Sequence, residues 1–160
     1  MEISVKVKTR DFGEVEVNTE DIISFEQKIF GFDRYTDFIM LYDDEFNGEY
    51  AWLQSVEEPE LCFIIANPEL LIKDYDPCYP PEVKSVLGSG TYEKWLIMVV
   101  KESIEDSTVN LKSPIIINFE KHRAMQVILE DEYPVRYRLF DNGQKELSLI
   151  HISEPTRLDV

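Results

Sequence analysis

The sequence is poor in the side chains that most often carry out chemistry. It has only two cysteines, Cys62 and Cys78, and only two histidines, His122 and His151. The cysteines are not spaced as a Cys-x-x-Cys pair and are too few for a disulfide framework, which favours a reducing compartment. The chain also has no Gly-x-Ser-x-Gly motif, so no nucleophile can be paired with a base. We therefore expect no enzyme, and neither a metal site nor a cofactor.

Positive charge and long apolar runs are scarce as well. The chain has 16 Lys and Arg against 32 Asp and Glu, which gives a formal net charge of -16 at pH 7. A surface of this sign repels nucleic acid and anionic membranes, so we expect direct contact with neither. The longest apolar run, from Trp95 to Val100, is too short to span a bilayer, and the first twenty residues hold no apolar segment typical of a signal peptide. These patterns predict a cytoplasmic protein.

The chain does contain enough apolar mass for one core. Hydrophobic residues make up 44% of its 160 residues and aromatic residues 12%, a composition unlike that of acidic disordered chains. The acidic surplus has two interpretations, which are a solubilising surface and a docking face for a basic partner.

Short apolar runs predict a mostly β fold. Residues 3–7 and 15–17 alternate apolar with polar side chains on either side of Asp11-Phe12-Gly13, as in a β-hairpin. Further short runs, bounded by Gly, Pro, Asn or acidic clusters, occur at 37–42, 50–56, 61–66, 94–101, 108–111, 115–118 and 125–129. This spacing is typical of an antiparallel sandwich or closed barrel, and we expect a small antiparallel barrel-like domain. One short helix is expected near 80–88, where two prolines precede it and Gly88 ends it.

Two acidic clusters fall in predicted turns. Asp43-Asp44-Glu45-Phe46-Asn47-Gly48 resembles the start of a calcium-binding loop, but Gln54 stands where that loop needs a bidentate Glu. We therefore expect a hairpin turn with Asn47-Gly48 at its tip. The second cluster, Glu57-Glu58-Pro59-Glu60, is expected to be a solvated turn.

The end of the chain differs in character from the rest. Leu-Ser-Leu-Ile-His-Ile-Ser-Glu-Pro-Thr-Arg at 147–157 resembles one reading frame of the transposon-end adapter used to prepare sequencing libraries. We therefore expect residues 1–146 to form a single domain and 147–160 to be a non-native tail, the alternative being a native final strand. The tail holds two acidic residues and one arginine, so residues 1–146 keep a formal charge of -15.

Three blocks of sequence carry a resemblance to a known family. The first comprises residues 12–17, 20–25 and 31–32. The second is Trp-Leu-Gln-Ser-Val-Glu-Glu-Pro-Glu-Leu at 52–61, continuing through Phe63 to Asn67-Pro68. The third is Thr-Val-Asn-Leu-Lys-Ser-Pro-Ile-Ile-Ile-Asn at 108–118, followed by Gln-Val-Ile-Leu at 126–129. In this order they resemble the FliW family of flagellar assembly factors over about residues 3–140.

The resemblance implies a barrel-like domain that binds flagellin in the cytoplasm and also binds CsrA, an RNA-binding translational repressor. Secretion of flagellin would then release the protein to antagonise CsrA, which links flagellin synthesis to export. The acidic charge suits a partner that must be basic to bind RNA. We expect partner contacts at the two acidic turns, through Asp43, Asp44, Glu45, Glu57, Glu58 and Glu60.

Two other classes of function stay open at this level. A small-ligand-binding β-barrel with no regulatory role would need a lined interior cavity, and a sequence pattern does not distinguish hollow barrels from filled ones. A hydrolase would need a nucleophile–base pair that the sequence does not present.

Overall fold

The computed structural model describes residues 3–27, 29, 31, 34–103 and 106–139. Within them the elements run in the order β1 (Ser4–Lys8), β2 (Glu14–Asn18), the 3-10 helix η1 (Thr19–Asp21), β3 (Ile23–Gln27), β4 (Asp37–Leu41), the 3-10 helix η2 (Asp44–Phe46), β5 (Tyr50–Ser55), β6 (Cys62–Ala66), α1 (Pro68–Leu71), α2 (Glu82–Leu87), β7 (Tyr92–Val99), β8 (Thr108–Val109), β9 (Ile115–Asn118), β10 (Arg123–Gln126) and β11 (Tyr137–Arg138).

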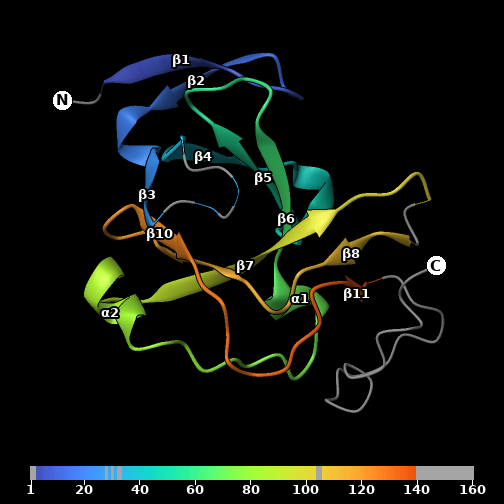
Figure 1. Ribbon diagram of the computed structural model, residues 1–160. Coiled ribbons are helices and arrows are strands. Elements are labelled where there is room, and N and C mark those ends of the chain that lie inside the picture. The colour runs from blue at the N-terminus through green and yellow to red at the C-terminus, as the bar shows by residue number, and fades with distance from the viewer. Residues whose placement is uncertain (1–2, 28, 30, 32–33, 104–105, 140–160) are drawn as a thin grey trace.

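A closed barrel lies at the centre of the fold (Figure 1). Seven strands form the ring in the order β3-β4-β5-β6-β7-β9-β10, and β10 returns to β3. The long strand β7 makes closure possible, because residues 96–98 pair with β6 and residues 92–95 pair with β9. The β10–β3 pair is parallel, whereas the other pairs of the ring are antiparallel. The mostly β, barrel-like fold class expected from the sequence is confirmed.

The barrel interior is filled by large apolar side chains. Phe25 and Phe38 meet edge to face with ring centroids 5.2 Å apart, and Leu53 and Ile65 beside them are fully buried. The interior set comprises Ile23, Phe25, Ile29, Phe38, Ala51, Leu53, Ile65, Trp95, Ile115, Ile117 and Ala124. Among the described residues this packing leaves the small-ligand alternative without the lined interior that it requires.

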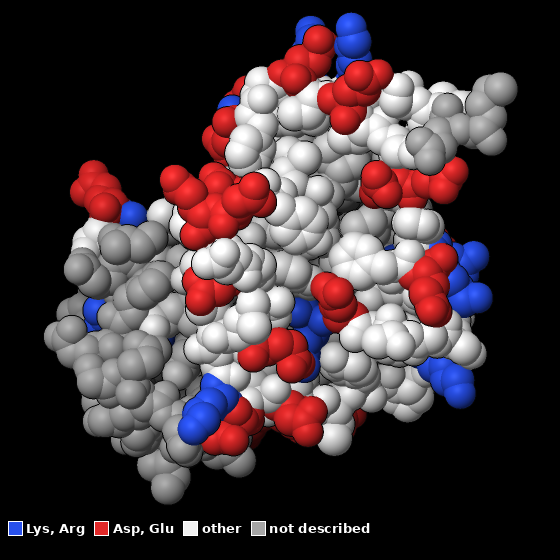
Figure 2. Space-filling view, turned by 180° about the vertical axis from the view of Figure 1, so that it is seen from behind, with Lys and Arg blue, Asp and Glu red and all other residues white. Residues whose placement is uncertain are grey.

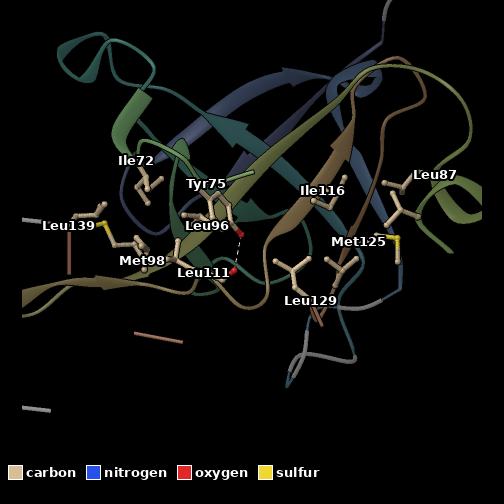
Figure 3. Close-up of a cluster of buried hydrophobic side chains, with 14 residues drawn as sticks. Ile72, Tyr75, Leu87, Leu96, Met98, Leu111, Ile116, Met125, Leu129 and Leu139 are labelled. Carbon is tan, nitrogen blue, oxygen red and sulfur yellow. Dashed lines mark hydrogen bonds between the residues drawn. The ribbon is translucent and has the colours of Figure 1, made fainter. Parts of the chain in front are cut away.

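A second core covers the outside of the barrel (Figure 3). Leu96, Met98 and Ile116 point outward from the strands and pack against α2 and against the segments around Tyr75 and Leu129. The hydroxyl of Tyr75 donates a 2.7 Å hydrogen bond to the carbonyl oxygen of Leu111. Burial raises the pKa of Tyr75, so this phenol stays a donor across the physiological range.

The β1–β2 hairpin forms a separate two-stranded sheet that lies across one end of the barrel (Figure 1). Val7 pairs with Val15 and is buried, whereas Ile3 is 60% exposed. The expected hairpin is therefore confirmed, although only part of its apolar face is covered.

Individual elements differ from expectation where they are short. The helix near 80–88 is confirmed as α2, with Gly88 at φ +82 after its last turn. A second helix, α1, was not expected: it has four residues and is capped by Asn67, whose side chain accepts a hydrogen bond from the backbone N–H of Glu69. Strands β3 and β11 were also missed, and β10 begins two residues before the expected run at 125–129. The boundary after residue 146 and the tail at 147–160 lie outside the described residues.

Candidate functional site

The two acidic turns predicted as partner contacts lie at opposite ends of β5. Residues 43–48 connect β4 to β5, and residues 57–60 lie between β5 and β6. Since β5 has six residues, each rising by about 3.3 Å, the two turns are about 20 Å apart along the strand. The six predicted carboxylates therefore form two separate groups and not one cluster.

The first acidic turn, residues 43–48, is a preformed hairpin connection. The carboxylate of Asp43 accepts a 2.9 Å hydrogen bond from the backbone N–H of Glu45, and a single 3-10 turn follows. Asn47 and Gly48 take left-handed conformations with φ of +51 and +84, so the chain reverses where the sequence placed the tip. Asp44 and Glu45 are exposed, and their side chains make no hydrogen bond or ion pair within the described part of the chain.

The second acidic turn, residues 57–60, is more ordered than a solvated turn. The hydroxyl of Ser55 accepts hydrogen bonds from the backbone N–H groups of Glu57 and Glu58. The carboxylate of Glu57 in turn accepts the backbone N–H groups of Thr36 and Asp37, at 3.0 and 3.2 Å. Glu57 is exposed, as expected of a solvated turn, and its side chain also fastens the turn to the start of β4.

The carboxylates of Glu58 and Glu60, in the same turn, differ from each other in their contacts. Glu58 accepts a 3.2 Å hydrogen bond from the backbone N–H of Glu60, whereas the side chain of Glu60 is exposed. Within the described residues, the side chains of Asp44 and Glu45 make no hydrogen bond or ion pair. The pKa of Arg10 is raised by its hydrogen bond to Asp11 and also by the charge of the exposed Glu60.

Gln54 holds the second acidic turn and the β1–β2 hairpin together. It is fully buried, and its amide nitrogen lies 3.0 Å from the carbonyl oxygen of Pro59 and 3.2 Å from that of Leu61. Its side-chain oxygen accepts a 3.0 Å hydrogen bond from the backbone N–H of Arg10. The Arg10 guanidinium adds a 2.9 Å hydrogen bond to the carbonyl oxygen of Cys62. The sequence interpretation gave Gln54 no such role.

An aromatic strip lies on the outer face of the first half of β5. It consists of Phe12, Phe46, Tyr50 and Trp52. Trp52 lies 5.1 Å from Phe12 and 5.8 Å from Phe46, and Phe46 lies 5.5 Å from Tyr50, as ring centroids. Phe12, in the β1–β2 turn, is 37% exposed, and the other three are partly exposed. Burial and the nearby Glu49 raise the pKa of Tyr50, so the strip itself carries no charge at neutral pH.

The strip was not predicted, although one signal for it exists. Ala51 and Leu53 fill the barrel interior, so the alternation of a strand requires Tyr50 and Trp52 to face outward. Large aromatic side chains on an outer face are typical of interaction surfaces. Figure 2 shows one face of the molecule, on which acidic side chains outnumber basic ones and are separated by uncharged surface.

The remaining candidate groups do not assemble into a reactive site. Burial raises the pKa of the Cys62 thiol to about 11, so it stays protonated, while Cys78 is exposed. No group of three or more His, Cys, Asp or Glu in the described ranges is placed to hold a metal ion. The same part of the chain contains no helix with the length and hydropathy needed to cross a membrane.

A surface cavity of about 410 Å³ lies between α1, residues 72–76 and Lys94. A smaller one of about 220 Å³ adjoins it and shares Glu69 and Lys94. The Lys94 ammonium, whose side chain is 11% exposed, pairs with the carboxylate of Glu69 and so holds α1 against β7. The ion pair between Lys94 and Glu69 therefore has a structural role.

Comparisons with known proteins show the family of this chain. The family model described as FliW protein matches residues 6–139. The chain belongs to the FliW family. It is 40% identical over 140 residues to the flagellar assembly factor FliW of Caldicellulosiruptor saccharolyticus, covering 85% of this chain and 91% of that one. It is 35% identical over 149 residues to the flagellar assembly factor FliW of Lachnospira eligens, covering 89% and 99%.

A solved structure agrees with the sequence relatives. The crystal structure of a flagellar assembly factor FliW superposes with a TM-score of 0.80 at 30% identity, covering 88% of this chain and all of that one. The resemblance read from the sequence is thus confirmed. Its Trp-Leu-Gln-Ser block supplies Trp52 of the strip, Gln54 and Ser55. In the Val-Asn-Leu block, Asn110 accepts the backbone N–H groups of Lys112 and Ser113 and shapes the turn before β9.

Proposed function

We propose that this protein is a cytoplasmic flagellar assembly factor that binds flagellin and antagonises CsrA, and that it is not an enzyme. In this scheme flagellin and CsrA are its two protein partners, and secretion of flagellin leaves the protein free to act on CsrA. Membership of the FliW family supports a role in flagellar assembly. The scheme would make the protein a regulator of translation that touches no nucleic acid itself.

The observation that carries the CsrA part of the proposal is the set of available carboxylates beside the aromatic strip. Asp44 and Glu45 directly precede Phe46 of the strip, and Glu60 lies in the turn at the other end of β5. An RNA-binding protein must present Lys and Arg, so a chain with a formal charge of -16 attracts it and repels its RNA. The carboxylates then add contacts and the aromatic rings add burial.

The proposal is tested by titrating the purified protein against CsrA, alone and with flagellin present. We expect binding of both partners at micromolar or lower concentrations. Asp44→Lys combined with Glu45→Lys should weaken CsrA binding by about 1 to 3 kcal/mol if these side chains are central to the contact. The matched control is Glu130→Lys with Glu132→Lys, which makes the same charge change at two exposed residues between β10 and β11.

The control separates a local contact from net charge. If both double variants weaken CsrA binding equally, only the overall field matters and the contact is misassigned. A folded sample that binds neither CsrA nor flagellin at these concentrations contradicts the proposed function itself.

A further inference from the structure

The β1–β2 hairpin is held together more firmly than it is held to the barrel. Its two strands of five residues pair along their whole length, and the backbone N–H of Thr19 closes the open end with a 2.8 Å hydrogen bond to the carbonyl oxygen of Ile3. Neither strand pairs with the nine-stranded sheet. Within the described residues, the hydrogen bonds from the hairpin to the barrel strands all come from Arg10, which donates to Gln54 and to Cys62. The hairpin can therefore leave the barrel without breaking a strand ladder.

The hairpin covers a row of side chains that belongs to neither core. Ile39, Gln54 and Cys62 lie side by side on the outer face of β4, β5 and β6, because Ile39 pairs with Gln54 and Gln54 pairs with Cys62. All three are buried. Three of the described buried hydrophobic residues lie outside both the interior set and the second core, and they are Val7 of the hairpin with Ile39 and Cys62 of this row. The contact between hairpin and barrel is thus a small apolar layer of its own.

The turn of the hairpin lies beside the Cys62 thiol. The Arg10 guanidinium donates its 2.9 Å hydrogen bond to the carbonyl oxygen of Cys62. Burial raises the pKa of the thiol to about 11, and the charges of Arg10 and Asp11 also act on it. Cys62 is 7% exposed. The closed hairpin therefore shields the thiol from reagents by contact and also keeps it protonated.

A short connection joins the hairpin to the barrel. The 3-10 helix η1 follows β2 directly, and none of its three residues is buried. Figure 1 shows the hairpin at the top of the view, with the chain passing from β2 down into β3. A hinge needs only a few loop residues that absorb changes in backbone angles, and η1 is placed to supply them.

We propose that the β1–β2 hairpin is a flap that opens from the barrel as one unit, about η1 as its hinge, while the barrel stays folded. Opening uncovers Ile39 and Cys62 on the outer face of the barrel. It also separates Phe12 from Trp52, whose ring centroids are 5.1 Å apart in the closed form. The closed flap is therefore the form in which the aromatic strip is complete, and this device is independent of the proposed partners.

Thiol labelling measures the opening directly. Cys78→Ser leaves Cys62 as the only thiol of the chain, and an aromatic disulfide reagent at pH 8 is the probe. The labelling rate, divided by the rate for the urea-unfolded chain, gives the fraction of molecules in which Cys62 is uncovered. Urea denaturation gives the fraction that is globally unfolded. We expect Cys62 to react at least about tenfold faster than global unfolding allows, and labelling at the rate set by global unfolding would overturn the flap.

Variants then show which segment moves. Phe12→Ala should speed the labelling of Cys62 by about tenfold, and Arg10→Ala by about threefold, because each removes a contact of the closed flap. The matched control is Tyr75→Phe, which removes a hydrogen bond of the second core and lowers global stability. It should leave the labelling rate within about twofold. Acceleration by Tyr75→Phe in proportion to its loss of global stability would overturn the flap.

A second control separates the flap from the neighbouring acidic turn. Glu57→Gln loosens residues 57–60 from the start of β4 and leaves the contacts of the hairpin in place. It should leave the labelling of Cys62 within about twofold. Acceleration larger than that of Arg10→Ala would place the opening in the turn and overturn the flap.

Hydrogen exchange gives an independent measure of the same opening. The backbone N–H of Arg10 is bonded to the buried side chain of Gln54, so it exchanges only when the hairpin leaves the barrel. We expect its opening constant to agree with that from Cys62 labelling within about threefold. An Arg10 amide that opens at least about tenfold less often than Cys62 is uncovered would show that the hairpin stays in place, which would overturn the flap.

Discussion

At the residue scale, the buried side-chain amide of Gln54 joins its own strand, β5, to two other segments of the chain. Gln54 serves the second acidic turn through its nitrogen and the β1–β2 hairpin through its oxygen, and no exposed part of it contacts solvent. The hydrogen bond from Arg10 to Gln54 joins residues that are 44 positions apart in the sequence. Because Phe12 lies just after Arg10 and Trp52 just before Gln54, the same bond fixes where Phe12 lies relative to Trp52. The aromatic strip therefore depends on a polar residue that is not part of it.

Replacing Gln54 should be costly for this reason. Gln54→Ala leaves the backbone N–H of Arg10 and the carbonyl oxygen of Pro59 without their side-chain partner, while the carbonyl oxygen of Leu61 keeps the backbone N–H of Ser55. We expect the free energy of unfolding to fall by about 2 to 3 kcal/mol, measured by urea denaturation. Arg10→Ala is the control: it keeps the backbone N–H and should cost less than about 1 kcal/mol. A loss for Gln54→Ala no larger than that of the control would contradict the role assigned to the amide.

The two cysteines should differ in reactivity. Cys78 is exposed, whereas the Cys62 thiol is buried with a pKa of about 11, so one thiol should react rapidly with an aromatic disulfide reagent at pH 8. Cys78→Ser should abolish that rapid phase. Since the pKa of Cys62 is higher in the folded state than its ordinary 9.0, the stability it contributes is complete below pH 9 and is lost as pH rises through about 11. Rapid reaction of both thiols would show that the region around Cys62 opens readily.

At the element scale, the second acidic turn contains one carboxylate that binds backbone groups, that of Glu57, and one that is exposed without a hydrogen bond in the described residues, that of Glu60. Glu57→Gln should weaken the hydrogen bonds to the backbone N–H groups of Thr36 and Asp37 and lower the free energy of unfolding by about 1 kcal/mol. Glu60→Gln removes an exposed charge whose interaction with the partly exposed Arg10 is screened by solvent, and it should leave stability within about 0.5 kcal/mol. Thermal melts and CsrA titrations of both variants provide the measurement. Equal stability of the two would return Glu57 to the status of a solvated side chain.

Strands that carry a short apolar run between turn residues are the ones that the sequence predicts well. Strands β4, β5, β6 and β9 lie within a residue or two of the expected runs, because the filled barrel interior and the second core outside it bury much of both faces of the sheet. The four-residue helix α1 and the two-residue strand β11 are too short to show any period. The Asn67-Pro68 cap was readable but leads into only one helical turn.

The candidate site was predictable only in part. The acidic turns are visible as clusters, but the tasks of Asp43, Glu57 and Glu58 depend on backbone groups that the fold brings to them. The outward side of β5 is as apolar as its inward side, so hydropathy alone does not mark Trp52 as a surface residue. Its contact with Phe12 is a tertiary one, which no local pattern contains.

At the scale of the whole molecule, the acidity and the fold belong to the same part of the chain. The family match covers residues 6–139, and residues 1–146 carry a formal charge of -15. We predict that truncation after Glu146 leaves the melting temperature and both partner affinities unchanged within error, because the sequence predicts that residues 147–160 are a non-native tail without selected contacts. Calorimetry of the truncated and full chains makes the comparison. A drop of several degrees would mean that residues 147–160 contribute to the fold.

The charge of the whole molecule should govern how fast CsrA arrives, and the aromatic strip should govern how long it stays. A formal charge of -15 on residues 1–146 attracts a basic partner over distances that salt shortens to about 8 Å at physiological ionic strength. The association rate constant should therefore fall steeply as NaCl rises, while the dissociation rate constant changes little, because apolar contacts are not screened. Trp52→Ala should show the converse, with faster dissociation and an unchanged salt dependence of association. Surface plasmon resonance across a salt series separates the two constants, and an association rate that does not respond to salt would remove electrostatic steering from the mechanism.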